Sequence, residues 1–316
     1  MPMSIVRSAL VVLSAASIAN AQPHDSTRAV LVTGASSGIG RKITERLVAR
    51  GFFVYAGARA QKDLDDLNHI KNVQAIRLDV TLPRDISAAV STVANAGRGL
   101  YGVVNNAGVV VVAPLIEADE KDLDFIFNVN LYGPYRITKA FAPLLLASRG
   151  RIINISSLNG IVASPMIGAY SMSKHAVEAY GDALSAELSR FGIRVSLIEP
   201  GNYGTEIGRN VLARMDTSIV KGSRFEAQMR GAINSMRQFE SYPPPDEVAD
   251  AVYDALTSAT PKMRYLVVPA QNQAAIAIRT AIDHVVQMNQ DQRFSYDRDA
   301  LVKMLDEALE RAKQRR

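Results

Sequence analysis

Short apolar runs alternate with stretches of helical periodicity from residue 28 onward. The continuous apolar runs, typical of buried parallel strands, are 28–33, 51–59, 73–79, 100–105, 151–157 and 193–198. Helical spacing fills the intervals at 41–50, 63–69, 83–95, 120–148 and 170–190, and a looser helix and strand follow within 245–269. This alternation predicts an α/β fold over residues 28–269, a single domain built on a Rossmann-type doubly wound parallel sheet with helices on both faces.

The chain begins with a segment of different character. Arg7 supplies a short basic region, residues 9–19 are almost wholly apolar or small, and Ala19-Asn20-Ala21 has the small-x-small form of a cleavage site. Residues 1–21 therefore predict a signal-peptide-like leader and export to a periplasmic or secretory compartment. An uncleaved anchor, or a cytoplasmic protein whose translation starts later, are the alternatives.

After residue 269 the chain continues as a C-terminal helical extension, 270–316. Amphipathic helices are expected at 274–288 and 299–312, the second with apolar residues such as Leu301, Leu305 and Leu309 on one side. Three roles are open for them: covering the substrate entrance, joining subunits, or peripheral contact with a membrane. The acidic residues of the last helix weigh against the membrane.

Composition narrows the chemistry. The net charge of +5 on 316 residues is modest and partly terminal, so no nucleic-acid partner is expected. Cysteine is absent, which excludes disulfides and thiolate chemistry. The four histidines are scattered without ligand spacing, so no metal site is expected.

The first predicted strand runs into a glycine turn, residues 33–40, and a predicted helix follows it. Glycines let the backbone approach a pyrophosphate, and a helix N-terminus offers unpaired N–H groups and the positive end of its dipole. Strand, glycine turn and helix in this order predict a phosphate cradle for a dinucleotide. The strand-then-glycine form recurs at 100–108.

The second predicted strand ends in Ala58 and Arg59, with Lys62 close by. An acidic residue here would bind the ribose hydroxyls of NAD, whereas an arginine suits the additional phosphate of NADP. NADP is therefore the predicted cofactor, with NAD as the alternative, unless Arg59 merely caps the strand. Asp79, at the end of the third strand, either accepts from the adenine amino group or caps the turn that follows.

Tyr170 and Lys174 lie one helical turn apart within 170–190, so the phenol and the ammonium can point into one space. A nearby cation favours the phenolate and lowers the pKa of a tyrosine, which would make a usable general acid/base. The alternative is an ordinary helix with Tyr170 half-buried and Lys174 solvated. The same helix is expected to bury Val177, Leu184 and Leu188.

Taken together, these motifs resemble those of the classical short-chain dehydrogenase/reductase family. The matching elements are Thr33-Gly34-x-x-x-Gly38-x-Gly40, Asn105-Asn106-Ala107-Gly108, Asn130, Ser157 thirteen residues before Tyr170, Tyr170-x-x-x-Lys174, and Pro200-Gly201-x-x-x-Thr205. The resemblance is strong over residues 28–205 and looser through 245–269. It implies a homodimer or homotetramer formed through the helices that hold Asn130 and Tyr170.

The resemblance also implies residue roles. Tyr170 would be the acid/base, Ser157 would bind the substrate oxygen, Lys174 would lower the tyrosine pKa and hold the nicotinamide ribose, and Asn130 would position a relay water. The cofactor-binding residues it implies are Gly34, Ser36, Ser37, Gly38, Ile39, Gly40, Arg59, Asp79, Val80, Asn106, Ala107, Gly108, Tyr170, Lys174, Pro200, Gly201, Tyr203 and Thr205. Tyr203 departs from the family, which often carries a small aliphatic residue there.

The expected activity is an NAD(P)-dependent oxidoreductase, an alcohol dehydrogenase or carbonyl reductase, that interconverts an alcohol and its carbonyl compound by hydride transfer. The segments expected around the substrate are 109–115, 158–168 and 203–238. The first two are short of charge, which favours an apolar substrate, and the third is either a mobile lid or an ordinary helix pair. The competing hypothesis is a nucleotide-binding sensor or scaffold that has the fold but no turnover.

Overall fold

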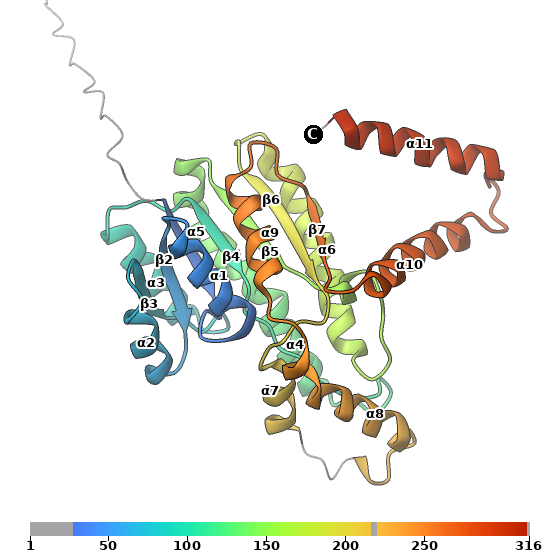
Figure 1. The fold of residues 1–316 in the computed structure, drawn as a ribbon, viewed down its shortest axis with the longest axis horizontal. Coiled ribbons are helices and arrows are strands. Elements are labelled where there is room, and N and C mark those ends of the chain that lie inside the picture. The colour runs from blue at the N-terminus through green and yellow to red at the C-terminus, as the bar shows by residue number, and fades with distance from the viewer. Residues whose placement is uncertain (1–27, 216–219, 315–316) are drawn as a thin grey trace, which may run out of the picture.

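A seven-stranded parallel sheet runs through the centre of the molecule (Figure 1). The computed structural model describes residues 28–215 and 220–314, so the predicted leader lies outside the described residues. In sequence the strands are β1 (Ala29–Thr33), β2 (Phe53–Ala58), β3 (Val73–Arg77), β4 (Gly102–Asn105), β5 (Arg151–Ile155), β6 (Arg194–Pro200) and β7 (Arg264–Val267). Their order in the sheet is β3-β2-β1-β4-β5-β6-β7, which confirms the predicted doubly wound α/β fold.

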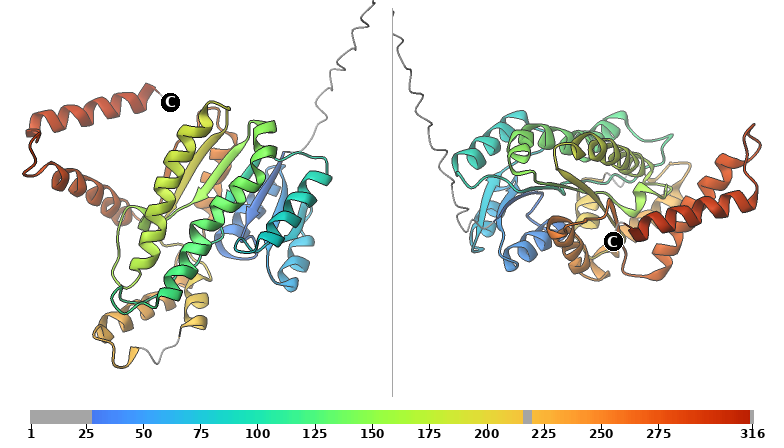
Figure 2. Two further views of the ribbon diagram at one scale, coloured as in Figure 1. Left: turned by 180° about the vertical axis from the view of Figure 1, so that it is seen from behind. Right: turned by 90° about the horizontal axis from the view of Figure 1, so that it is seen from above.

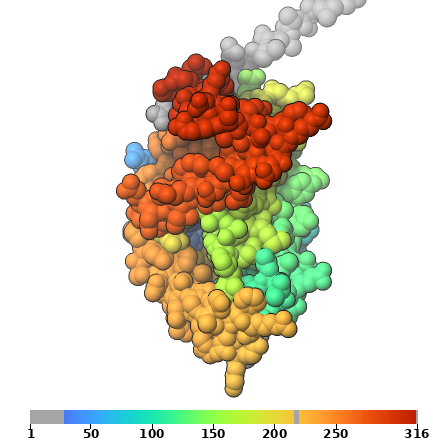
Figure 3. Space-filling view, turned by 90° about the vertical axis from the view of Figure 1, so that its right-hand side faces the viewer, coloured from blue at the N-terminus to red at the C-terminus, as the bar shows by residue number. Residues whose placement is uncertain are grey.

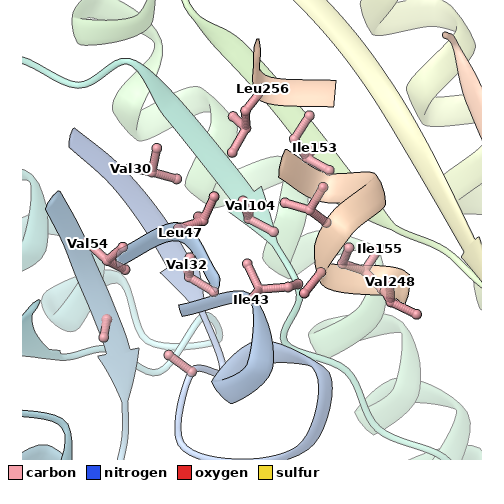
Figure 4. Packing of buried hydrophobic residues seen from close by; sticks show 14 of the residues in the cluster. Val30, Val32, Ile43, Leu47, Val54, Val104, Ile153, Ile155, Val248 and Leu256 are labelled. Atoms are coloured by element: carbon pink, nitrogen blue, oxygen red, sulfur yellow. The ribbon is translucent and has the colours of Figure 1, made fainter. Parts of the chain in front are cut away.

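Helices cover both faces of this sheet (Figure 2). They are α1 (Gly38–Ala49), α2 (Gln61–Asn68), α3 (Pro83–Asn95), α4 (Glu120–Asn130), α5 (Tyr132–Ser148), α6 (Gly168–Ser189) and α9 (Asp246–Thr257). On one face α1 and α9 pack on the central strands, where Ile43, Leu47 and Val248 meet Val32 and Val104 (Figure 4). Since both faces are covered, every residue of β1 and β4 is buried, as their continuous apolar sequences require.

The order of the strands reverses between β1 and β4, because β2 follows β1 on one side and β4 lies on the other. At such a switch point the loops leaving the two strands diverge and open a crevice at their carboxyl ends. The loops after β1, β2, β4, β5 and β6 all leave this edge, since the strands are parallel. The predicted site residues are therefore brought to one edge of the sheet.

The single helix expected at 120–148 is two helices, α4 and α5, separated at Leu131. Pro134, in the first turn of α5, has no N–H with which to bond the carbonyl of Asn130. Leu131 takes φ −113° and ψ −57°, and the Asn130 side chain turns to a neighbouring loop. The apolar periodicity continues across the break, which explains why the pattern alone does not reveal it.

The segment after β6 forms two helices, α7 (Ile207–Arg214) and α8 (Glu226–Arg237). Met229 and Met236 of α8 are buried; Met236 packs with Val110 and Val112, and both methionines lie in clusters that include Met166. These helices thus lie against the loops that follow β4 and β5. Whether they open and close as a lid stays a prediction.

The C-terminal extension forms an arm of two helices, α10 (Gln271–Asn289) and α11 (Arg298–Gln314), which projects from the body (Figure 1). In side view the arm lies across the upper part of one side of the molecule (Figure 3). Large apolar residues of both helices are exposed: Ile276, Ile278, Ile282, Val285, Val286, Met288, Val302, Met304, Leu305 and Leu309. Across residues 28–215 and 220–314, no helix is long and apolar enough to cross a membrane.

Candidate active site

The turn between β1 and α1 brings backbone close to backbone. Gly34 has φ +64°, a left-handed conformation that favours glycine. A Cβ on Gly40 would lie 2.2 Å from the carbonyl oxygen of Gly34 and 2.4 Å from Asn106 Nδ2, so no larger residue fits. The first turn of α1, which begins at Gly38, therefore presents its N–H groups directly above the sheet edge, as a phosphate cradle requires.

Thr33 and Asn106 lock this turn to the loop after β4. The hydroxyl of Thr33 accepts hydrogen bonds from the backbone N–H groups of Asn106 and Ala107, both at 3.0 Å. The side-chain amide of Asn106 donates to the carbonyl oxygens of Thr33 and Gly34, at 2.9 and 3.0 Å. The two loops that flank the switch point are thus held in fixed relation to each other.

A cavity of about 660 Å³ occupies the crevice, a size within the usual range for small-molecule sites. It is lined by every predicted cofactor-binding residue: Gly34, Ser36, Ser37, Gly38, Ile39, Gly40, Arg59, Asp79, Val80, Asn106, Ala107, Gly108, Tyr170, Lys174, Pro200, Gly201, Tyr203 and Thr205. Ser157 also lines it, whereas Asn130 lies behind the wall. The glycine cradle and this continuous lining fit an extended dinucleotide, with its diphosphate at α1.

Arg59 lies at the far end of the cavity, where its side chain is 70% exposed. One guanidinium nitrogen is 3.9 Å from a carboxylate oxygen of Asp79. The other oxygen of Asp79 accepts from the N–H and the hydroxyl of Thr81, at 2.9 and 2.6 Å. Asp79 therefore caps the turn after β3, one of its two predicted roles, and Arg59 stays accessible to a ligand.

Tyr203 does not present its hydroxyl to the cavity. Its ring is 2% exposed and belongs to the core beneath the sheet edge, and its hydroxyl donates to Glu247 of α9. Burial and the Glu247 carboxylate raise its pKa far above the ordinary value. The expected cofactor contact of Tyr203 is thus limited to the part of the residue that lines the wall, while neighbouring Thr205 packs 3.2 Å from the Cβ position of Gly38.

Tyr170 stands in the first turn of α6, half-buried in the cavity wall. Burial raises the pKa of its phenol above the ordinary value, and a hydrogen bond with Ser157 offsets part of this rise. Desolvation thus dominates the pKa of Tyr170, and its lowering by Lys174 stays a prediction. A phenol that keeps its proton at neutral pH can act as a general acid.

Lys174 lies one turn after Tyr170, with its ammonium 5.7 Å from the centre of the tyrosine ring. It is 4% exposed, and Nζ donates to the carbonyl oxygen of Ile155 at 2.8 Å. Burial lowers the pKa of Lys174 to about 8, and the carboxylate of Glu178 opposes this lowering. The lysine is therefore not a solvated surface residue, and its charge near neutral pH depends on its neighbours.

Asn130 is 1% exposed and fully engaged with protein groups. Its Oδ1 accepts from the N–H of Val109 at 2.8 Å, and its Nδ2 donates to the carbonyl oxygen of Val109 and to Ser173 Oγ, both at 2.9 Å. Gly108 stands between Asn130 and Lys174, with its Cβ position 3.6 Å from Asn130 Oδ1 and 3.8 Å from Lys174 Nζ. The relay water stays a prediction. The structure shows that Asn130 anchors the loop after β4.

The sequence patterns did not single out three polar residues near the site. Glu178 and Glu199 are buried behind Lys174, and Gln273 of α10 accepts from the backbone N–H of Asn202 beside the cavity. The spacing of four residues between Lys174 and Glu178 on one helix could have identified Glu178.

The helix α6 buries Lys174, Glu178 and Val177, whereas Leu184 and Leu188, which were expected to be buried, are only partly covered.

Apolar residues gather around Tyr170 in the cavity wall. Val109, Val110, Ile167 and Met236 come from the three segments predicted to surround the substrate and Phe239 follows the third, while polar Asn159, Glu206 and Asn210 also line the cavity. The first two segments are joined by a hydrogen bond from the N–H of Ala113 to the carbonyl oxygen of Met166 at 2.8 Å.

In the described part of the chain, no group of three or more His, Cys, Asp or Glu side chains could hold a metal ion.

Comparisons with known proteins agree with this geometry. The family model of the short chain dehydrogenases matches residues 28–216, more than half of the chain. Human 17-beta-hydroxysteroid dehydrogenase type 6 is 33% identical over 263 residues, which cover 77% of this chain and 81% of that protein. Mitochondrial D-beta-hydroxybutyrate dehydrogenase of Rattus norvegicus is 32% identical over 262 residues, which cover 76% of each.

A solved structure of a short chain dehydrogenase is also similar to this chain. A short chain dehydrogenase from Burkholderia cenocepacia, in complex with NADP, is 28% identical with a TM-score of 0.64, and the alignment covers 83% of this chain and 95% of that one. The extent of these matches, together with the glycine cradle and the grouping of Ser157, Tyr170 and Lys174, leads to one conclusion. The chain belongs to the short-chain dehydrogenase/reductase family of oxidoreductases.

Proposed function

We propose that the protein is an NADP-preferring carbonyl reductase and alcohol dehydrogenase, with Tyr170 as its acid/base. One observation carries the proposal: Ser157, Tyr170 and Lys174 line the same cavity as the glycine cradle of α1. A carbonyl group beside Tyr170 would lie next to the bound nicotinamide. NADPH, when bound, supplies the hydride that adds to the carbonyl carbon.

The residues around the carbonyl complete the reaction. Tyr170 donates its phenolic proton to the substrate oxygen as the hydride adds to carbon, so the product is a neutral alcohol. Ser157 Oγ accepts from the N–H of Asn159 at 3.1 Å and hydrogen-bonds with Tyr170, and a substrate oxygen placed between the two hydroxyls would receive the serine proton instead. Lys174, an ammonium with three donors, holds the ribose and stabilises the phenolate left on Tyr170.

An apolar substrate is supported by the lining of the cavity around Tyr170, where Val110, Ile167, Met236 and Phe239 meet. The two relatives named above act on a hydroxysteroid and on hydroxybutyrate, compounds that share a hydroxyl group but differ in size and polarity. The apolar lining favours the larger, less polar class for this chain. NADP is supported by Arg59, which stands at the end of β2 without an acidic residue beside it in sequence.

The test compares wild type with Tyr170→Phe. NADPH and NADH binding is measured by fluorescence titration, and turnover is then measured on a panel of apolar and polar ketones and aldehydes. Tyr170→Phe is expected to bind NADPH with unchanged affinity and to lose turnover by a factor of about 100 or more. Tyr296→Phe, exposed before α11 and outside the cavity, is the matched control. If neither cofactor binds, the protein has the fold but not the proposed activity. Cofactor binding without turnover would favour the alternative, a nucleotide-binding sensor.

We also propose a homodimer or homotetramer formed through α6, which holds Tyr170, and through α4 and α5, which were expected as the one helix that holds Asn130. Exposed apolar residues lie on this face, among them Tyr132, Tyr135, Leu146 and Met172. Sedimentation velocity would detect the oligomer, and Tyr135→Glu with Met172→Glu should dissociate it.

Export by residues 1–21 is likewise a proposal. The mass of the N-terminal peptide of the mature protein, isolated from its natural compartment, tests it.

A further inference from the structure

A cluster of charged side chains lies behind the catalytic residues, on the side of α6 that faces β6 and β7. Arg264 of β7 donates from Nε to Glu178 at 2.9 Å and from Nη2 to Asp182 at 2.7 Å. The same Nε is 3.5 Å from Glu199 of β6. None of these four residues lines the cofactor cavity, so the cluster is separate from the cofactor site.

The cluster has more acidic groups than basic ones. Three carboxyl groups, those of Glu178, Asp182 and Glu199, share one guanidinium. The side chain of Asp182 is 55% exposed and solvated, whereas the side chains of Glu178 and Glu199 are 11% and 2% exposed. Two carboxylates buried side by side repel each other and lose their hydration, so one of them is more stable with a proton.

Two carboxyl oxygens of the pair have room for that proton. Oε1 of Glu178 and Oε1 of Glu199 are both buried without a hydrogen-bond partner in the described structure, as is Oγ of Ser156, and the nearest cation to Glu199 Oε1 is Arg264 Nε at 3.5 Å. Ser156 Oγ and Glu178 Oε1 lie within 3.0 Å of the point where a Cβ on Gly160 would stand. The glycine therefore keeps these two oxygens facing one small space, next to the backbone of the catalytic Ser157.

The cluster also reaches Lys174. Glu178 follows Lys174 by one turn on the buried face of α6, and its charge is the attraction that opposes the loss of the lysine proton. Lys174 donates to the carbonyl oxygen of Ile155, the residue that precedes Ser156. A change of charge on Glu178 is thus felt at the ammonium beside Tyr170, without any contact between Glu178 and the cofactor cavity.

We propose that Glu199 and Glu178 share one proton behind the active site, carried mainly by Glu199, and that the charge left on Glu178 keeps Lys174 protonated for the reaction. Glu178 is then a positioning residue that acts through Lys174. The burial of Glu199 and its contact with Glu178 raise the pKa of Glu199 to about 7, and Arg264 opposes this rise. The consequence for turnover rests on the proposed function, whereas the proton and its effect on Lys174 do not.

The experiment titrates Lys174 directly in full-length protein labelled with ¹³Cε-lysine, by ¹H–¹³C NMR from pH 6 to 11. The signal is assigned by its loss in Lys174→Arg. Glu178→Gln is expected to move the titration of Lys174 to lower pH by about one pH unit, because it removes the charge. Glu199→Gln, a change to an amide of the same size in the same cluster, should leave it within a few tenths, because Glu178 and not Glu199 is the carboxylate that acts on Lys174. No movement in Glu178→Gln, or equal movement in both variants, would overturn the proposal.

A second measurement needs no Glu178 variant and so holds if Glu178→Gln does not fold. Infrared spectra of wild type at pH 6 should contain the C=O band of a buried protonated carboxyl group, and this band should vanish in Glu199→Gln. A spectrum unchanged by Glu199→Gln would refute the shared proton. With a substrate in hand, the pH profile of kcat/KM should shift in Glu178→Gln and be restored by Glu178→Asp. An NMR shift without any change in this profile would reject the role of Lys174 in turnover while leaving the shared proton intact.

Discussion

The side-chain amide of Asn130 pairs with both backbone polar groups of Val109, accepting from its N–H at 2.8 Å and donating to its carbonyl oxygen at 2.9 Å. A residue at the end of α4 thereby fixes the loop that leaves β4 toward the active site. Asn130 is the last residue of α4, directly before the break that precedes α5.

Asn130→Ala should therefore reduce both stability and activity. The substitution removes two part-buried hydrogen bonds with Val109 and a buried one with Ser173, at a cost of about 2–4 kcal/mol in the free energy of unfolding. Urea unfolding measures this loss. Asn128→Ala, two residues earlier on α4, removes a part-buried hydrogen bond with Arg136 and should cost about 1 kcal/mol. Equal losses in the two variants would show that the loop is held by other contacts.

Gly40→Ala should weaken cofactor binding at least tenfold and destabilise the fold. Its methyl group would lie 2.2 Å from the carbonyl oxygen of Gly34, and backbone atoms cannot rotate away. The expected loss is roughly 1–3 kcal/mol. Gly231→Ala is the matched control, because Gly231 lies within α8 with no atom within 4 Å of its Cβ position. That substitution should raise stability by roughly 0.5–1 kcal/mol. Thermal unfolding and NADPH titration distinguish the two variants. If Gly40→Ala changes neither stability nor NADPH affinity, the close backbone packing at Gly40 is refuted.

Arg59→Asp should weaken the binding of NADPH more than that of NADH. The guanidinium at the end of β2 is exposed to the cavity, and its replacement by a carboxylate would repel the additional phosphate of NADPH but not the ribose hydroxyls of NADH. A change of at least tenfold in the ratio of the two dissociation constants is expected. Arg84→Asp makes the same change of charge on α3, outside the cavity, and should leave the ratio unaltered. Equal losses for both cofactors with Arg59→Asp would exclude this residue as the basis of preference.

The stability of the protein should fall as the pH rises through neutrality. Burial raises the pKa of Glu199 from the ordinary 4.5 to about 7, so the folded state binds this proton more tightly than the unfolded state does. The stabilisation is complete below about pH 4.5 and is lost as the pH passes through 7, by an amount on the order of 2 kcal/mol. Urea unfolding at intervals from pH 5 to 8 measures it. Glu199→Gln should reduce the change in the free energy of unfolding between pH 5 and 8. If this variant shows the same dependence on pH as wild type, the assignment of the effect to Glu199 is contradicted.

Local patterns predicted the elements that form the site. The glycine turn at 33–40 and the spacing of Tyr170 and Lys174 depend on backbone conformation over one or two turns, which neighbouring residues decide. Helix and strand bounds agree closely in the structure, as at Pro83–Asn95, where proline begins the helix and the sequence marks its start. Because all the strands are parallel, the motifs at their ends had to share one edge of the sheet.

Tertiary structure decided what these residues touch. Asn130 meets Val109 and Ser173, and Arg264 meets Glu178 and Glu199, across separations that no local periodicity encodes. Tyr203 lies in the core, where its hydroxyl donates a hydrogen bond to the Glu247 carboxylate of α9. The pKa of Tyr170 is raised because the whole wall of the cavity removes water from it. The sequence by itself determined the fold and the composition of the site, since both follow from short-range conformation and burial pattern. The charges within the site were decided only by packing, since desolvation and long-range contacts exist only in the folded molecule.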